Sequence, residues 1–174
     1  MAKVAFLGLG VMGFPMAGHL AAKGHDVTVY NRTFAKAEQW TQKHKGQAKK
    51  TPREAAEGCD VVFCCVGNDD DLRSVVLGSD GALAGMKAGT IFVDNTTASA
   101  KVARELYAAA KKQGVDFIDA PVSGGQAGAE NGVLTVMCGG DQVPFDKAKP
   151  VIDSFARCCT LIGPSGAGQL TKMV

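Results

Sequence analysis

The N-terminal segment constrains the fold of this chain more strongly than any other part of it. The apolar run Val4–Leu7 leads directly into Gly8-Leu-Gly10-Val-Met-Gly13, and a segment with helical spacing, Phe14–Lys23, follows. In a G-x-G-x-x-G turn between a strand and a helix, the first glycine makes the tight turn and the second lets the backbone approach a pyrophosphate. The third lets the helix pack close to the strand. Unpaired N–H groups at the positive end of the helix dipole then hold the diphosphate.

This pattern predicts a dinucleotide site, and the alternative is a glycine-rich turn that packs closely for steric reasons alone. The residues expected to contact the cofactor here are Gly8, Leu9, Gly10, Val11, Met12 and Gly13. The composition agrees with close backbone approaches, because 22 of the 174 residues are glycine, against a typical usage of about 7%.

The first 22 residues also contain a stretch that resembles a membrane span or a signal sequence. Residues 4–22 carry no formal charge over 19 positions, but they include Gly8, Gly10, Gly13, Pro15 and Gly18 and lack a cleavage site of small residues. The whole chain is 46% hydrophobic and 21% charged, with a net charge of +2. We therefore expect a globular, cytoplasmic protein with no membrane and no nucleic-acid partner.

Short apolar runs alternate with helical patterns over the rest of the chain. Several runs are apolar at consecutive positions, which favours strands covered on both faces of a parallel sheet. The runs are Val4–Leu7, Val27–Tyr30, Val61–Val66, Ile91–Val93, Phe117–Ile118, Leu134–Met137 and Leu161–Ile162. The alternation predicts an α/β fold of the Rossmann type: a doubly wound, mostly parallel sheet with helices on both faces.

Capping residues mark the expected helices. Ser99 is a candidate N-cap for a helix that ends near Gly114, and Thr51 precedes a helix with Pro52 at its first position. Another helix is expected over Phe34–Lys43. A last one begins at Pro144, and Pro150 should kink it or delay its start.

The end of the second strand indicates which dinucleotide is bound. An NAD site places Asp or Glu there to hold the ribose 2′-OH, whereas this chain has Asn31-Arg32-Thr33, and Asp26 starts the strand instead of ending it. A guanidinium and hydroxyl donors suit a 2′-phosphate. We therefore predict a preference for NADP(H) over NAD(H), with Asn31, Arg32 and Thr33 as contacts; the alternative for Arg32 is a solvated surface charge.

Two further glycine-rich segments narrow the interpretation. Phe117-Ile-Asp119-Ala-Pro121-Val-Ser123-Gly124-Gly125 is a strand that ends in a rigid turn, and Gly163-Pro-Ser-Gly166-Ala-Gly168-Gln-Leu-Thr-Lys172 is a turn that enters a helix. With the N-terminal G-L-G-x-M-G, they resemble the β-hydroxyacid dehydrogenase family. Its members include 3-hydroxyisobutyrate dehydrogenases, tartronate semialdehyde reductases and glyoxylate/succinic semialdehyde reductases. The resemblance covers essentially the whole chain, and D-A-P-V-S-G-G is a highly specific string.

The resemblance implies a substrate site for a small carboxylic acid. Ser123, Gly124 and Gly125 would hold the substrate carboxylate, and Thr97 would contact both cofactor and substrate. Lys172 would be the general acid that protonates the carbonyl oxygen as hydride arrives from the nicotinamide. This role agrees with elementary chemistry, since hydride transfer to an aldehyde leaves negative charge on oxygen that a nearby proton donor must stabilise.

The resemblance also implies further cofactor contacts and a domain organisation. Val66, Gly67 and the loop to Asp71 would line the dinucleotide, although the family often has Leu-Pro at the first two positions. An NADP-binding domain is expected over residues 1–164, with the start of an interdomain helix over 165–174. The family continues into a helical domain that makes a homodimer or higher oligomer. It also pairs its lysine with an asparagine three residues later, one position beyond Val174.

Other candidate sites are weaker. The six cysteines contain no C-x-x-C pair, so we interpret them as thiols in a reducing compartment and expect no metal site. Asp69-Asp70-Asp71 is interpreted as the charged start of a helix near Leu72.

Three functions follow from the sequence. The first is an NADP-dependent reductase or dehydrogenase of a small β-hydroxy acid and its semialdehyde. The second is a module that binds NADPH without turnover because the helical domain is missing. The third, an imine-reducing relative, is disfavoured because such relatives typically lack the lysine found at position 172.

Overall fold

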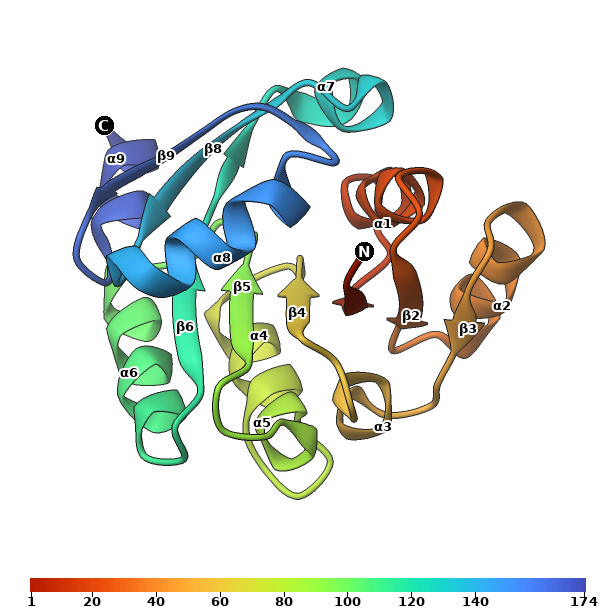
Figure 1. Ribbon diagram of the computed structural model, residues 1–174, viewed down its shortest axis with the longest axis horizontal. Coiled ribbons are helices and arrows are strands. Elements are labelled where there is room, and N and C mark those ends of the chain that lie inside the picture. Colours follow the sequence, from red (N-terminus) through yellow and green to blue (C-terminus); the bar gives the residue numbers. More distant parts are fainter.

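One mixed sheet runs through the whole molecule, and its strand order confirms the predicted fold class. The computed structural model describes residues 1–174, with nine strands in the order β3-β2-β1-β4-β5-β6-β8-β7 and with β9 paired to β8 (Figure 1). Neighbouring strands from β3 to β6 are parallel, whereas β8 is antiparallel to β6 and β7. The strands are β1 Lys3–Leu7, β2 Asp26–Tyr30, β3 Gln47–Ala48, β4 Val61–Cys64, β5 Ile91–Asp94, β6 Asp116–Asp119, β7 Val122–Ser123, β8 Leu134–Gly139 and β9 Ala156–Gly163.

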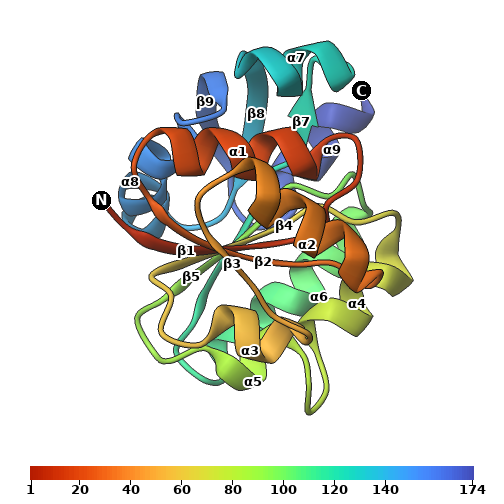
Figure 2. The same ribbon diagram turned by 90° about the vertical axis from the view of Figure 1, so that its right-hand side faces the viewer.

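Helices cover both faces of this sheet. They are α1 Gly13–Ala22, α2 Phe34–Lys43, α3 Pro52–Ala56, α4 Asp69–Val76, α5 Ala82–Gly85, α6 Ala100–Lys111, α7 Gly125–Asn131, α8 Gln142–Ile152 and α9 Ala167–Met173. Figure 2 shows α1 and α8 on one side of the strands and α3, α5 and α6 on the other. The predicted caps are confirmed, since the hydroxyl of Ser99 accepts from the Val102 N–H and that of Thr51 accepts from the Glu54 N–H.

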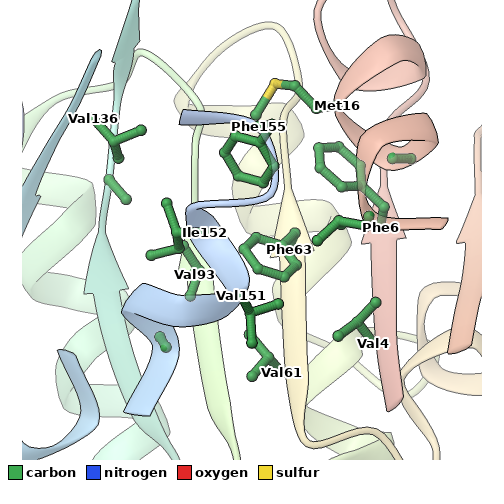
Figure 3. Close-up of a cluster of buried hydrophobic side chains, with 14 of the residues drawn as sticks. Val4, Phe6, Met16, Val61, Phe63, Val93, Val136, Val151, Ile152 and Phe155 are labelled. Atoms are coloured by element: carbon green, nitrogen blue, oxygen red, sulfur yellow. The ribbon is translucent and has the colours of Figure 1, made fainter. Parts of the chain in front are cut away.

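Aromatic packing fixes the first helix against the central strands. Phe6 of β1 and Phe63 of β4 are register partners, and their rings stack with centroids 6.0 Å apart. Phe155 meets Phe63 edge-on at 5.7 Å, and Met16 of α1 belongs to the same buried cluster (Figure 3). Burial of each such side chain contributes about 1.5–3 kcal/mol. This packing holds the turn between β1 and α1 in place at the carboxyl end of β1.

The strand order places a crevice beside that turn. From β1 the chain builds outward through β2 and β3 and then returns to form β4 on the other side of β1. Ligands of open α/β sheets bind outside the carboxyl ends of the strands where the order reverses in this way. The loops that follow Leu7 and Cys64 flank this point.

Some predicted boundaries are wrong. β4 ends at Cys64 and not at Val66, because the chain leaves the sheet there to form the loop between β4 and α4. β9 begins at Ala156, well before Leu161; it bonds only to β8 and is largely exposed, so it needs no continuous apolar run.

The last predicted helix also differs. α8 begins at Gln142, ahead of Pro144, and continues through Pro150, so the expected delay of its start is wrong. Pro144 is tolerated because N–H groups in the first turn of a helix lack an intrahelical partner, and Pro150 lies exposed near the end of the helix.

The uncharged N-terminal residues form β1, the glycine turn and α1. No helix combines the length and the apolar character that crossing a membrane would require.

Candidate functional site

A cleft of about 620 Å³ opens at the carboxyl ends of β1, β2 and β4. It brings together most of the residues predicted to bind a dinucleotide, and we call it the dinucleotide cleft. Those that line it are Gly8, Leu9, Gly10, Val11, Met12, Gly13, Asn31, Arg32, Val66, Gly67 and Asp71. Two predicted cofactor contacts, Thr33 and Thr97, do not line the cleft. Thr33 sits at the N-cap position of α2, where its side chain makes no capping hydrogen bond, and Thr97 lines a second cavity.

The three glycines of the turn have different surroundings. Gly8 has a φ of +100°, and a Cβ there would lie 2.2 Å from the Cys65 carbonyl oxygen. A Cβ on Gly13 would lie 2.0 Å from the carbonyl oxygen of Gly8 and 2.9 Å from the Phe6 ring. Around Gly10 there is nothing within 4 Å, so its backbone faces open space in the cleft. This cradle fits a diphosphate, because the missing side chain leaves the backbone accessible.

The side chain of Asn31 stabilises the glycine turn through a hydrogen bond. Its Oδ1 accepts a hydrogen bond from the Leu9 N–H at 2.9 Å, and its Nδ2 donates to the Thr33 carbonyl at 3.0 Å. Both ends of the amide are therefore engaged with the backbone, and Asn31 connects the end of β2 to the glycine turn. Its neighbour Arg32 is 87% exposed and lies 3.8 Å from the Asp71 carboxylate.

Sequence reasoning missed several residues at this end of the cleft. Tyr30, Lys50, Thr51, Ser74 and Asp80 also line it. Lys50 follows the two-residue strand β3, and its ammonium lies 5.6 Å from the centre of the Phe34 ring. The sequence signal for Lys50 is its place in a cluster of basic residues with Lys43, Lys45 and Lys49, which does not distinguish a cleft residue from a solvated one.

A second cavity of about 340 Å³ contains every residue expected to bind substrate. Thr97, Ser123, Gly124, Gly125 and Lys172 line it together. They come from the segment after β5, from β7, from the start of α7 and from α9. The half-buried Lys172 extends its Nζ to within 3.2 Å of Ser123 Oγ, to which it donates a hydrogen bond.

The two cavities adjoin. Met12, Cys65, Val66 and Gly67 line both of them. A ligand lying along the dinucleotide cleft thus has direct access to the cavity that holds Lys172.

Buried polar residues support the boundary between the cavities. The Val66 N–H donates to Thr96 Oγ1 at 3.1 Å, and Asn95 Nδ2 donates to the Ala120 carbonyl at 2.8 Å. Asp94 is fully buried, and its Oδ1 accepts from the Thr96 N–H at 3.0 Å. Burial raises the pKa of Asp94 to about 7.

The three adjacent aspartates form the first turn of α4, as predicted, although the N-cap is Asn68. Asp69 accepts hydrogen bonds from the backbone N–H and the hydroxyl of Ser99, and these bonds lower the pKa of its carboxyl. No three His, Cys, Asp or Glu side chains are grouped as a metal site.

Comparisons with known proteins agree with this geometry. Residues 3–163 match the family described as the NAD binding domain of 6-phosphogluconate dehydrogenase. An uncharacterized oxidoreductase of Shewanella frigidimarina is 67% identical over 174 residues, which are 100% of this chain and 60% of that protein. A probable 3-hydroxyisobutyrate dehydrogenase-like protein of Arabidopsis thaliana is 40% identical over 98% of this chain and 56% of its own length.

A solved structure shares the same arrangement. Mycobacterium tuberculosis 3-hydroxyisobutyrate dehydrogenase with L-serine superposes with a TM-score of 0.92 at 35% identity, covering 99% of this chain and 58% of that one. The chain therefore spans about 60% of the length of the proteins it matches.

Proposed function

The chain belongs to the β-hydroxyacid dehydrogenase family, and from that premise we propose that it carries the cofactor site and part of the substrate site of an oxidoreductase. The reaction proposed is hydride transfer between NADP(H) and a small β-hydroxy acid or its semialdehyde. One observation carries the proposal. Lys172 Nζ lies 3.2 Å from Ser123 Oγ, in a cavity that shares Met12 and Val66 with the dinucleotide cleft.

Lys172 serves as the general acid in this proposal. A bound nicotinamide dinucleotide supplies the hydride for reduction and accepts it for oxidation. Reduction leaves negative charge on the carbonyl oxygen, and Lys172 Nζ donates a proton to that oxygen. In the oxidation direction the same amine accepts the hydroxyl proton.

Ser123, Gly124, Gly125 and Thr97 orient the substrate. The Ser123 hydroxyl and the backbone of the two glycines bind the carboxylate, and Thr97, from the segment after β5, contacts the substrate in the same cavity. Because Ser123 already receives a hydrogen bond from Lys172, a carboxylate bound at Ser123 lies next to the proton donor. This arrangement favours substrates in which the carboxylate and the reacting carbonyl are a short distance apart.

Arg32 supports the preference for NADP(H). β2 begins at Asp26 and ends at Tyr30, so no carboxylate from the end of this strand is available for a ribose 2′-OH. Arg32 and Lys50 are the cations that line the cleft. Two cations in one cleft suit the added charge of a 2′-phosphate.

Cofactor titration and turnover test these statements separately. The chain is titrated with NADPH and NADH, and tighter binding of NADH would contradict the preference. NADPH oxidation is then followed with glyoxylate, succinic semialdehyde and tartronate semialdehyde. Turnover supports the reductase, whereas binding without turnover supports the second candidate, a cofactor-binding module. That candidate is kept because these residues span only about 60% of the relatives' length.

A further inference from the structure

A buried carboxylate accepts hydrogen bonds from the start of α9, the helix that carries Lys172. Asp119, the last residue of β6, is fully buried. Its Oδ1 accepts from the Gly166 N–H at 2.8 Å, and its Oδ2 accepts from the Gln169 N–H at 3.1 Å. A Cβ on Gly168 would lie 2.3 Å from the Met137 carbonyl oxygen and 2.8 Å from that of Asp119, so α9 lies as close to the sheet as its backbone allows.

The side chain of Gln169 fastens the same helix to a different segment. It is fully buried, and its Nε2 donates to the Thr96 carbonyl at 2.7 Å. Its Oε1 accepts from the Ala98 N–H at 3.1 Å. The two bonds flank Thr97, which lines the substrate cavity.

These contacts continue to the dinucleotide cleft. Thr96 receives Gln169 on its carbonyl and the Val66 N–H on its hydroxyl. Val66 lines both cavities. The polar groups at the carboxyl ends of β4, β5 and β6 are thus linked by hydrogen bonds to α9.

Gln169 and Lys172 lie three residues apart on α9, so they share one face of the helix. The opposite side of α9 carries Leu170 and Thr171, which are both exposed, so that side makes few contacts with the rest of the protein. The buried contacts of Asp119 and Gln169 therefore set the position and rotation of α9 relative to the sheet. They thereby set the position of the Lys172 amine.

We propose that Gln169, together with Asp119, is a positioning residue that aligns Lys172 with Ser123 and Thr97. The inference rests on the proposed function and deepens it. The amide of Gln169 holds the Thr97 segment and α9 in one register. The carboxylate of Asp119 supports this by fixing the start of α9. Neither side chain lines the substrate cavity, so they act through Lys172.

The test compares three variants with the wild type. Gln169→Met removes both amide hydrogen bonds at similar volume, and Asp119→Asn converts one acceptor into a donor. Thr171→Ala is the matched control, because Thr171 lies on the same helix, is exposed, and its hydroxyl donates only to the Ala167 carbonyl. Circular dichroism and NADPH titration establish that each variant is folded and keeps its cofactor site. If Gln169→Met does not fold, Gln169→Glu replaces it, because this variant keeps an acceptor for the Ala98 N–H and loses the donor to the Thr96 carbonyl.

The first readout is kinetic. We expect Gln169→Met to lower kcat for semialdehyde reduction about 10- to 100-fold, because small misplacement of a catalytic group costs on this order, with the Kd for NADPH changed less than about twofold. Thr171→Ala should behave like the wild type. Loss of NADPH affinity in parallel with kcat, or an unchanged kcat, would overturn the proposal.

The second readout does not require turnover. Lysine acetylation by an N-hydroxysuccinimide ester is followed residue by residue by mass spectrometry, with the exposed Lys101 as internal reference. Gln169→Met should raise the Lys172 rate at least threefold relative to Lys101. An unchanged ratio contradicts positioning. If the wild type shows no turnover, the proposed function fails for this chain, while the labelling ratio still decides the role of Gln169.

Discussion

Arg32 and Asp71 face each other at the dinucleotide cleft, with a guanidinium nitrogen of Arg32 3.8 Å from a carboxylate oxygen of Asp71. Arg32 follows β2 and Asp71 belongs to the first turn of α4, so the pair joins the loop after β2 to the start of α4. Both side chains are accessible, at 87% and 37% exposure, and such an ion pair contributes at most about 1 kcal/mol. A stronger anion can therefore displace Asp71 from Arg32.

Arg32→Ala should weaken NADPH binding about 10- to 100-fold, because charge-assisted hydrogen bonds to a phosphate contribute roughly 1.5–3 kcal/mol. NADH affinity should stay within about twofold, since NADH lacks the 2′-phosphate. Fluorescence titration with both cofactors measures the two constants. Lys87→Ala removes one exposed positive charge outside the cleft and serves as the control. An equal loss for NADPH and NADH would mean that Arg32 does not recognise the 2′-phosphate.

Asp71→Asn should have the opposite effect. The substitution removes the carboxylate that competes for Arg32 and would repel a 2′-phosphate. NADPH affinity should therefore rise about two- to fivefold, the range expected of an exposed ion pair, and the gain should shrink in high salt. Isothermal titration at two salt concentrations checks both statements. A lower NADPH affinity would show instead that Asp71 contacts the cofactor favourably.

Gly10→Ala and Gly13→Ala should separate binding from stability. A methyl group on Gly13 meets the Gly8 carbonyl oxygen and the Phe6 ring, so this variant should lose about 1–3 kcal/mol of unfolding free energy. A methyl group on Gly10 meets no protein atom and enters the cleft. That variant should unfold like the wild type but bind NADPH weakly. Thermal melts and titrations on the same samples test the pair, and equal destabilisation of both variants would contradict it.

Asp94 should make stability depend on pH. Burial raises its pKa to about 7 in the folded protein, whereas an aspartate in the unfolded chain titrates near ~3.9. Between these pH values the Asp94 carboxyl is ionised in the unfolded chain and protonated in the folded protein. The free energy of unfolding therefore falls as pH rises from about 4 to about 7.

The measurement is urea denaturation at pH 5 and pH 8. Relative to Asp94→Asn, the wild type should lose about 1–3 kcal/mol of unfolding free energy between the two pH values. The exposed Asp26→Asn is the control and should follow the wild type. If the wild type and Asp94→Asn show the same pH dependence, Asp94 is ionised in the folded protein across this range.

The sequence was sufficient to predict the parts of this molecule that depend on local chain geometry. Gly8 and Gly13 are required by close packing, and that requirement is visible in their spacing. The apolar runs of β1, β4 and β5 were recognisable because strands covered on both faces must be apolar at consecutive positions. β9 escaped full recognition because an edge strand has no such requirement.

Residues whose role depends on distant partners were not predictable in the same way. Gln169 lies in the glycine-rich segment 163–172, but nothing local indicates that its amide bonds to Thr96 and Ala98, more than seventy residues earlier. Lys50 reaches the cleft only because the short strand β3 pairs with β2. Ser123 and Lys172 were assigned through family resemblance, and their 3.2 Å contact spans 49 residues.

The most direct test is the reduction of a small semialdehyde by the wild type and by Lys172→Ala, with NADPH affinity measured on the same preparations. We expect the wild type to reduce the semialdehyde and the substitution to lower kcat about 100- to 10,000-fold, the usual range for a general acid. The Kd for NADPH should change less than about twofold, because Lys172 lines the substrate cavity and not the dinucleotide cleft. A Lys172→Ala variant that reduces the semialdehyde at the wild-type rate would contradict the role of Lys172 as the general acid.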